Sequence, residues 1–148
     1  MSAVSESPHF LCLQTLFENA PVSRLYGARA IVREGSATVT FRARPEFMHA
    51  AGGVHGSAYF RALDDAAFFA ANSREHDYLL ATLQFNVQFL RPCRGGGMLT
   101  AIGTLTYQSG NIFFARAELR GEHDQLLATG TGIFTRSGVP LSGEIGYR

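Results

Sequence analysis

Hydrophobic positions recur with helical spacing near the start of the chain. In residues 8–19 one helical face collects the apolar side chains, which are Phe10, Leu13, Leu16 and Phe17. Pro21 argues against continuation of this helix, because its ring carries no backbone N–H. The pattern therefore predicts a short N-terminal helix followed by a loop over residues 19–26.

Strand-like patterns occupy most of the remaining sequence. Residues 29–33 and 36–42 predict two strands around a tight turn at Glu34-Gly35. Four longer segments rich in Val, Ile, Thr, Phe and Leu follow, at residues 79–90, 98–108, 112–120 and 125–136. Turn residues separate these segments. The residues after Arg136 include glycines and a proline, and we expect a loose tail there.

One alanine-rich segment interrupts the strands. From Gly56 to about Asn72 the chain contains no further Gly and no Pro, and it is long enough for four helical turns. A helix that is apolar nearly all round must be covered on most sides. The order of elements predicts an α+β fold with an antiparallel sheet of about six strands wrapped around this central helix. We expect a single domain over residues 1–148, with a core at about 10–136 and a tail at 137–148.

The composition narrows the class of protein. Hydrophobic residues make up 46% of the 148 residues, charged residues make up 17%, and the formal net charge is +1. This balance argues against a nucleic-acid partner, and no apolar run reaches the roughly 20 residues that span a bilayer. Cys12 and Cys93 have neither a disulfide pattern nor metal-ligand spacing. We expect a cytoplasmic protein without membrane attachment.

Glycines surround the predicted start of the central helix. Gly52, Gly53 and Gly56 flank Val54-His55. The first N–H groups of a helix have no partner within it and lie at the positive end of its dipole. Such a helix start can bind an anion or a developing oxyanion. The same glycines would also suit a helix start that only needs a flexible backbone, and the spacing leaves both interpretations open.

Two adjacent carboxylates, Asp64 and Asp65, lie on this helix. Arg61 is within helical reach of either, so both could be solvated partners of one arginine. Apolar neighbours such as Phe60 and Phe68 give Asp64 a setting in which the pKa of a carboxyl can rise. Periodicity does not choose between the two aspartates. The chain has no Gly-x-Ser-x-Gly, Walker A or His-Glu-x-x-His motif, and its histidines are dispersed, so we expect no metal or cofactor.

Residues 49–72, HAAGGVHGSAYFRALDDAAFFAAN, resemble the signature of hotdog-fold acyl-CoA thioesterases of the phenylacetate-degradation type, within the 4-hydroxybenzoyl-CoA thioesterase superfamily. The family pattern is an Asn, a Gly three residues later, then His-Gly-Gly, and an Asp eight residues after the first Gly of that triplet. Gly52, His55-Gly56 and Asp64 match it. His49 stands in place of the Asn, and Ser57 in place of the second Gly. The strand order also matches over about residues 10–136.

The resemblance implies roles for the matching residues. Asp64 would act as general base or nucleophile, and the backbone N–H of Gly56 would bind the oxyanion. Thr82 would assist, although β-propensity also explains a threonine there. His49 would replace the amide donor of the family Asn with an imidazole N–H.

The resemblance also implies an assembly. Hotdog thioesterases form homodimers, or dimers of dimers, with active sites at the subunit interface. His55, Ser57, Phe60 and Phe68 would then contact an acyl-CoA substrate. Arg91 and Arg94 would bind the CoA phosphates, unless they are only solvated loop charges.

The function expected from these features is hydrolysis of an acyl-CoA thioester. One alternative is a non-catalytic acyl-CoA-binding hotdog domain, which the change to His49 keeps open. A weaker alternative is a hotdog dehydratase or hydratase that pairs His55 with Asp64.

Overall fold

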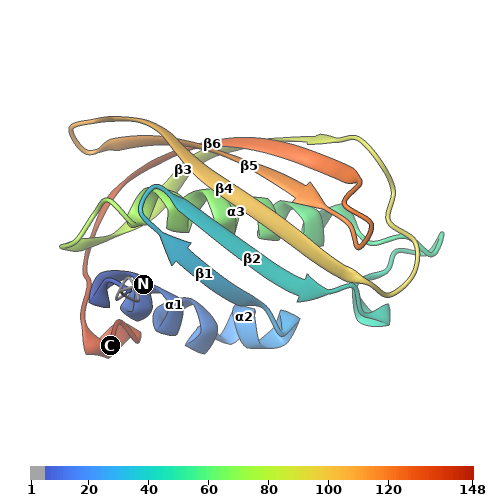
Figure 1. The fold of residues 1–148 in the computed structure, drawn as a ribbon, viewed down its shortest axis with the longest axis horizontal. Helices are drawn as coiled ribbons and strands as arrows, with labels where there is room; N and C mark the ends of the chain where they lie inside the picture. Colours follow the sequence, from blue (N-terminus) through green and yellow to red (C-terminus); the bar gives the residue numbers. More distant parts are fainter. Residues whose placement is uncertain (1–5) are drawn as a thin grey trace, which may run out of the picture.

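The computed structural model describes residues 6–148 and consists of one antiparallel sheet, a long helix and shorter helices around them (Figure 1). The elements follow in the order α1 (Pro8–Asn19), α2 (Pro21–Tyr26), β1 (Arg29–Arg33), β2 (Ser36–Arg42), η1 (Pro45–Phe47), α3 (Gly56–Asn72), β3 (Tyr78–Phe89), β4 (Met98–Ser109), β5 (Ile112–Arg120), β6 (Leu126–Pro140) and η2 (Gly143–Ile145). The six strands pair in the order β1-β2-β4-β5-β6-β3, so β1 and β3 are the two edges of the sheet. The predicted six-stranded hotdog architecture is confirmed.

The sheet covers one side of α3, and α1 and α2 lie beside β1 (Figure 1). Small side chains let α3 approach the sheet closely, because its sheet-facing positions include Ala58, Ala62, Ala66 and Ala70, all buried. Gly103 on β4 completes this contact: a Cβ atom there would lie 2.0 Å from the carbonyl oxygen of Ala66. The contact therefore requires glycine for space, since real side chains do not approach a backbone that closely.

The prediction of a loop over residues 19–26 is wrong. Pro21 ends α1, but it also occupies the first turn of a new helix, α2, where its missing N–H costs nothing. Gly27 then terminates α2 in a left-handed conformation, with φ of 64°. Ser23 and Tyr26 on this short helix both contact the side chain of Arg61 on α3.

The prediction of a loose tail after Arg136 is also wrong. Strand β6 continues to Pro140, and the backbone N–H of Leu141 donates to the carbonyl of Asp77 at 2.9 Å. The hydroxyl of Tyr147 lies 2.7 Å from Nδ1 of His9 on α1. The last residues therefore pack against the N-terminal helix, and their small and polar composition hid this docking.

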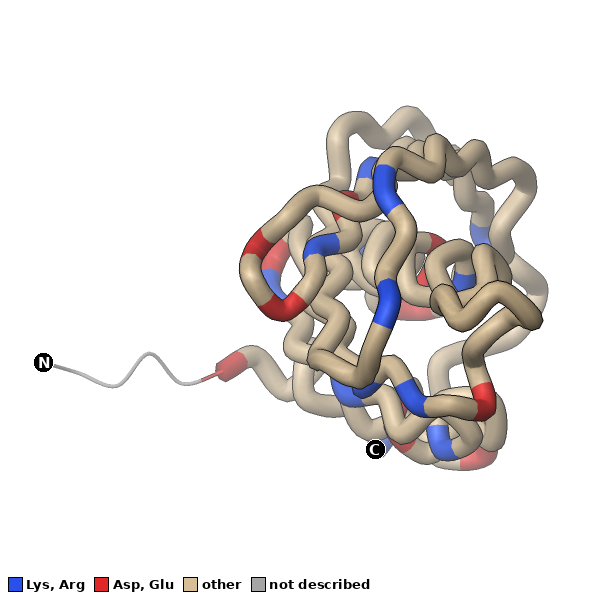
Figure 2. The backbone as a smooth tube through the Cα atoms, turned by 90° about the vertical axis from the view of Figure 1, so that its right-hand side faces the viewer, with Lys and Arg blue, Asp and Glu red and all other residues tan. Residues whose placement is uncertain are grey.

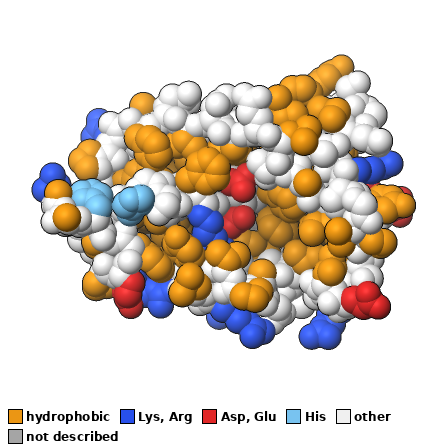
Figure 3. All heavy atoms as spheres, turned by 180° about the vertical axis from the view of Figure 1, so that it is seen from behind, with side chains coloured by type: hydrophobic (Ala, Val, Ile, Leu, Met, Phe, Trp, Pro, Cys, Tyr) orange, Lys and Arg blue, Asp and Glu red, His pale blue; other side chains and the backbone are white. Residues whose placement is uncertain are grey.

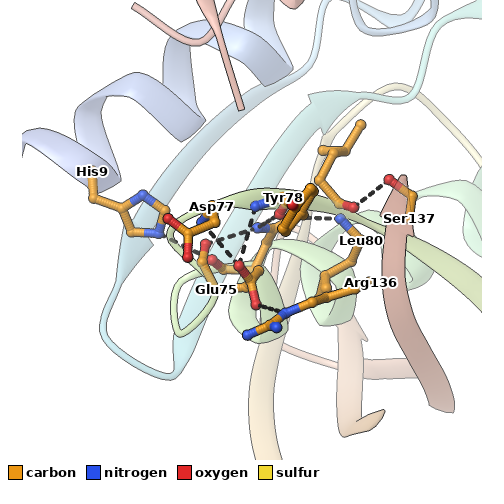
Figure 4. A network of polar contacts seen from close by, with 9 residues as sticks. His9, Glu75, Asp77, Tyr78, Leu80, Arg136 and Ser137 are labelled. Atoms are coloured by element: carbon orange, nitrogen blue, oxygen red, sulfur yellow. Dashed lines mark hydrogen bonds and ion pairs between the residues drawn. The ribbon is translucent and has the colours of Figure 1, made fainter. Parts of the chain in front are cut away.

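A buried polar network fixes the end of α3 (Figure 4). The carboxylate of Glu75 is 1% exposed and accepts hydrogen bonds from the backbone N–H groups of Asp77 and Tyr78 and from the side chain of Arg136 on β6. The side chain of Asn72 accepts from the N–H of Leu80 at 2.9 Å. These bonds tie the turn after α3 to β3 and β6. They therefore fix the position of β3 relative to α3 along the helix axis.

Charged residues are dispersed along the chain, with acidic and basic positions interspersed in Figure 2. None of the described helices is long and apolar enough to cross a membrane.

Candidate active site

The first turn of α3 is capped by His55. Its backbone is extended, with φ of −63° and ψ of 141°, and its Nδ1 accepts a hydrogen bond from the backbone N–H of Ser57 at 3.0 Å. The hydroxyl of Ser57 lies 2.7 Å from the same nitrogen. Because Nδ1 is the acceptor, a neutral His55 carries its proton on Nε2. The predicted substrate contact of His55 stays a prediction, with Nε2 as the free donor.

The imidazole of His49 lies against the glycine-rich loop before α3. Its Nδ1 accepts from the N–H of Ala51 at 3.1 Å, and a Cβ atom at Gly53 would lie only 2.8 Å from its Nε2. Glycine at position 53 therefore leaves the space that the His49 ring occupies. The loop directs His49 toward a pocket at the helix start.

That pocket has a volume of about 380 Å³ and is lined by His49, Val54, Gly56, Tyr59, Phe89, Leu90, Arg91 and Pro92. The ring of Phe89 would lie 3.2 Å from a Cβ atom at Gly56, so a side chain there would crowd the ring. Within residues 6–148, no protein group accepts a hydrogen bond from the Gly56 N–H. This N–H is available to an anionic atom at the positive end of the helix.

Tyr59 connects the pocket wall to the loop that carries Arg91. The phenol is buried, and its hydroxyl donates to the carbonyl oxygen of Arg91 at 3.0 Å. Burial raises the pKa of Tyr59 to about 12, so the phenol remains a donor. Arg91 is thereby held at the pocket. Arg94 instead lines a separate hollow with Gly95, Gly96 and Gly97, so the structure does not bring the two predicted arginines to one place.

Asp64 lies two turns further along α3, on the side that the sheet leaves open. The positions of α3 that are not fully buried follow one helical stripe: Gly56, Ser57, Phe60, Arg61, Asp64, Asp65 and Phe68. The hydroxyl of Thr82 on β3 donates to Oδ1 of Asp64 at 3.1 Å. Burial raises the pKa of Asp64, and the hydrogen bond from Thr82 opposes that rise. The predicted pair of Asp64 and Thr82 is thus in contact.

Asp65 has a different environment. Its Oδ2 lies 3.0 Å from Nε of Arg61, and the two side chains are only 22% and 12% exposed. The guanidinium also donates to the hydroxyl of Ser23 at 2.9 Å and lies 4.5 Å from the ring centroid of Tyr26. Asp65 therefore belongs to an ion pair within α3, and the arginine of that pair contacts α2. Asp64 has no basic partner among the described residues.

A β-bulge at Leu83 places Thr82 on the side of the sheet that faces α3. Thr82 pairs with the buried Phe134, and Phe85 pairs with Gly132, two residues earlier on the same strand. Paired residues share a face of the sheet, so Thr82 and Phe85 face the same side although three residues separate them. The extra residue, Leu83, makes this possible. A strict alternation would have turned one of them away.

Phe60 and Phe68 lie one helical turn before and after Asp64, and each packs against an aromatic ring of the sheet. The rings of Phe60 and Phe85 meet edge to face with centroids 5.5 Å apart, and those of Phe68 and Phe134 meet likewise at 5.7 Å. Figure 3 shows hydrophobic side chains gathered on this face of the molecule, with acidic and basic side chains near its middle. Sequence reasoning identified Phe60 and Phe68 but missed Phe85 and Phe89. The regular alternation of apolar and polar residues over residues 83–89 was the signal that both rings share one face of β3.

The predicted site residues thus form two groups, which lie at two places along α3. Gly56, His49 and Arg91 lie at its start, and Asp64 and Thr82 lie near its middle. Eight residues of α-helix separate Gly56 from Asp64, a distance of about 12 Å along the axis. The described residues contain no group of three or more side chains placed to hold a metal ion.

Comparison with known proteins places the chain in a family. A family model described as the thioesterase superfamily matches residues 51–128, which is more than half of the 148 residues. The chain therefore belongs to the thioesterase superfamily. A search of curated proteins found no match.

Solved structures share the fold. The PaaI protein of E. coli, from the phenylacetic acid degradation operon, is 24% identical and superposes with a TM-score of 0.81 over 92% of this chain and 100% of that one. A mutant of the phenylacetic acid degradation protein PaaI from Thermus thermophilus is 24% identical, with a TM-score of 0.72 over 79% of this chain and 99% of that one. A thioesterase from Haemophilus influenzae is 19% identical, with a TM-score of 0.73 over 82% of this chain and 85% of that one.

Proposed function

We propose that this protein hydrolyses an acyl-CoA thioester, with Asp64 as the carboxylate that activates water. One observation carries the proposal. In a member of the thioesterase superfamily, Asp64 lies on the open side of α3, accepts a hydrogen bond from Thr82 and has no basic partner in the described chain. Its neighbour Asp65 is occupied by Arg61. A carboxylate whose pKa is raised by burial is also a stronger base than an ordinary aspartate.

A second copy of the chain completes the proposed site. An oxyanion donor must lie about 3 Å from the reacting oxygen, and Gly56 lies about 12 Å along α3 from Asp64. The Gly56 N–H that serves a given acyl group therefore comes from another subunit. Strand β3 ends the sheet and carries Thr82, so its free edge offers a pairing surface that extends the sheet into a homodimer. A dimer of dimers would preserve the same sites.

The reaction needs no cofactor. Water attacks the thioester carbonyl carbon while Asp64 takes its proton, and the carbonyl oxygen becomes an anion bound by the Gly56 N–H. The C–S bond then breaks, and the CoA sulfur takes the proton from Asp64 to give the free acid and the thiol. Direct attack by the Asp64 carboxylate, followed by hydrolysis of the anhydride, gives the same products. His49 adds an imidazole at the pocket beside Gly56.

The substrate would lie across both groups of residues. Arg91, whose backbone is held by Tyr59, supplies a cation for a CoA phosphate at the pocket. The aromatic rings of Phe60 and Phe68 suit an apolar acyl group. The E. coli relative comes from the phenylacetic acid degradation operon, which makes aryl-acyl thioesters worthwhile members of a test panel.

A thiol-release assay over a panel of acyl-CoA esters tests the function. Hydrolysis predicts release of CoA thiol at a rate proportional to protein concentration. Thermal stabilisation by acyl-CoA without thiol release would favour the non-catalytic binding domain. Loss of enoyl-CoA absorbance without thiol release would favour a hydratase.

A further inference from the structure

The ring of Phe85 is recessed into the sheet by two glycines on the neighbouring strand. A Cβ atom at Gly130 would lie 2.6 Å from Cε1 of Phe85, and one at Gly132 would lie 2.6 Å from its Cδ2. Neither glycine has a positive φ, so the backbone conformation does not require glycine at either position. Space for the Phe85 ring requires glycine at Gly130, and space for the rings of Phe85 and Phe134 together requires it at Gly132.

The other side of this ring faces the proposed site. The rings of Phe85 and Phe60 meet edge to face, and Phe60 is 41% exposed and lies one helical turn before Asp64. Thr82, three residues before Phe85 on β3, donates to Asp64. The Phe85 ring therefore lies between the two glycines and Phe60, on the side of α3 that carries Asp64, and its depth determines how much room an acyl group has beside Phe60.

We propose that Phe85 sets the length of the acyl group that the site accepts, and that Gly130 and Gly132 act as positioning residues that set the depth of Phe85. The proposal rests on the proposed thioesterase function. A larger residue at Gly130 would push the Phe85 ring away from β6 and toward Phe60 on α3, because a ring edge shifts more cheaply than backbone. Loss of the ring would deepen the recess.

Chain-length profiles of three variants test the proposal. The values of kcat/KM are measured for a series of saturated acyl-CoA esters from acetyl to octanoyl. In Gly130→Ala the ratio of long-chain to short-chain kcat/KM falls about tenfold or more, the discrimination expected for displaced methylenes in an apolar pocket. In Phe85→Ala the ratio rises by a similar factor. The double variant Gly130→Ala/Phe85→Ala behaves as Phe85→Ala, because no ring remains to be displaced.

Gly138→Ala is the matched control on β6, since a Cβ atom there would meet nothing within 4 Å, and its profile should equal that of wild type. An equal loss at every chain length in Gly130→Ala, with an unchanged profile in Phe85→Ala, would overturn the proposal. If Gly130→Ala does not fold, the test uses Phe85→Leu and Phe85→Ala. The ratio of long-chain to short-chain kcat/KM should then rise in both, and an unchanged ratio would overturn the proposal. Wild-type protein that releases no thiol from any ester refutes the enzyme function itself, a distinct result.

Discussion

The ion pair between Arg61 and Asp65 gives a sharp prediction, because it assigns a structural role to the aspartate next to the proposed catalytic one. Asp65→Ala leaves the Arg61 guanidinium, 12% exposed, without its carboxylate. Breaking a buried pair from one side costs about 3–5 kcal/mol. Arg61 keeps its contacts with Ser23 and Tyr26, so we expect a loss of about 2–3 kcal/mol. In a chain of this size that lowers Tm by roughly 4–12 °C.

Thermal or urea unfolding at a pH above about 7 measures this loss, with Asp65 ionised. The double variant Arg61→Met/Asp65→Leu removes both charges and should recover most of the stability, since an apolar pair of similar volume often replaces a buried ion pair without loss. An unchanged free energy of unfolding in Asp65→Ala would refute the reasoning. The reasoning would also be refuted if the double variant lost more free energy of unfolding than the two single variants lose together.

Stability should also depend on pH through Asp65. Burial raises the pKa of Asp65 to about 7, against the opposing effect of Arg61. The folded state therefore binds this proton more tightly than the unfolded chain, whose value is near 3.8. The contribution of this group to the free energy of unfolding is greatest below 3.8 and is lost as the pH rises to about 7. In Asp65→Asn this part of the pH dependence should vanish, and a pH series of unfolding curves would show a persisting slope if the assignment is wrong.

Three further predictions concern the site and its support. Thr82→Val removes the hydrogen bond that opposes the raised pKa of Asp64, so the acid limb of the pH–rate profile should move to higher pH, while Thr82→Ser should keep it in place. Arg91→Ala should raise KM about fivefold with little change in kcat, the worth of one exposed charge contact; a change confined to kcat would contradict a binding role. Gly103→Ala should lower the free energy of unfolding by about 2–3 kcal/mol, because its Cβ would lie 2.0 Å from the carbonyl of Ala66; a calorimetric Tm equal to that of wild type would contradict the close packing.

Much of the fold could be predicted from the sequence, because its main elements have strong local patterns. Strand-like patterns marked the strands at residues 29–33, 36–42 and 112–120, and the alanine-rich run marked α3 with the same ends that the structure has. Pro21 was misinterpreted because proline ends one helix and begins another equally well. The residues after Arg136 were misinterpreted because their docking on α1 depends on contacts distant in sequence, such as that between Tyr147 and His9.

The sequence allowed the residues of the candidate site to be named, but not the contacts among them. Helical spacing allowed Arg61 to pair with either aspartate, and only α2, through Ser23 and Tyr26, draws its guanidinium toward Asp65. The α2 helix was itself missed, so this asymmetry could not be derived. The contact between Thr82 and Asp64 depends likewise on the bulge at Leu83, a shift of one residue in strand register that local propensity does not specify.

The central claim is that Asp64, and not Asp65, activates water at an acyl-CoA thioester. The most direct measurement is the steady-state rate of thiol release by Asp64→Asn and Asp65→Asn, side by side with wild type, on the best ester of the panel. We predict that Asp64→Asn loses about 100-fold or more in kcat while remaining folded, and that Asp65→Asn retains most of the wild-type rate. Near wild-type turnover in Asp64→Asn, or an equal loss in Asp65→Asn, would contradict the assignment.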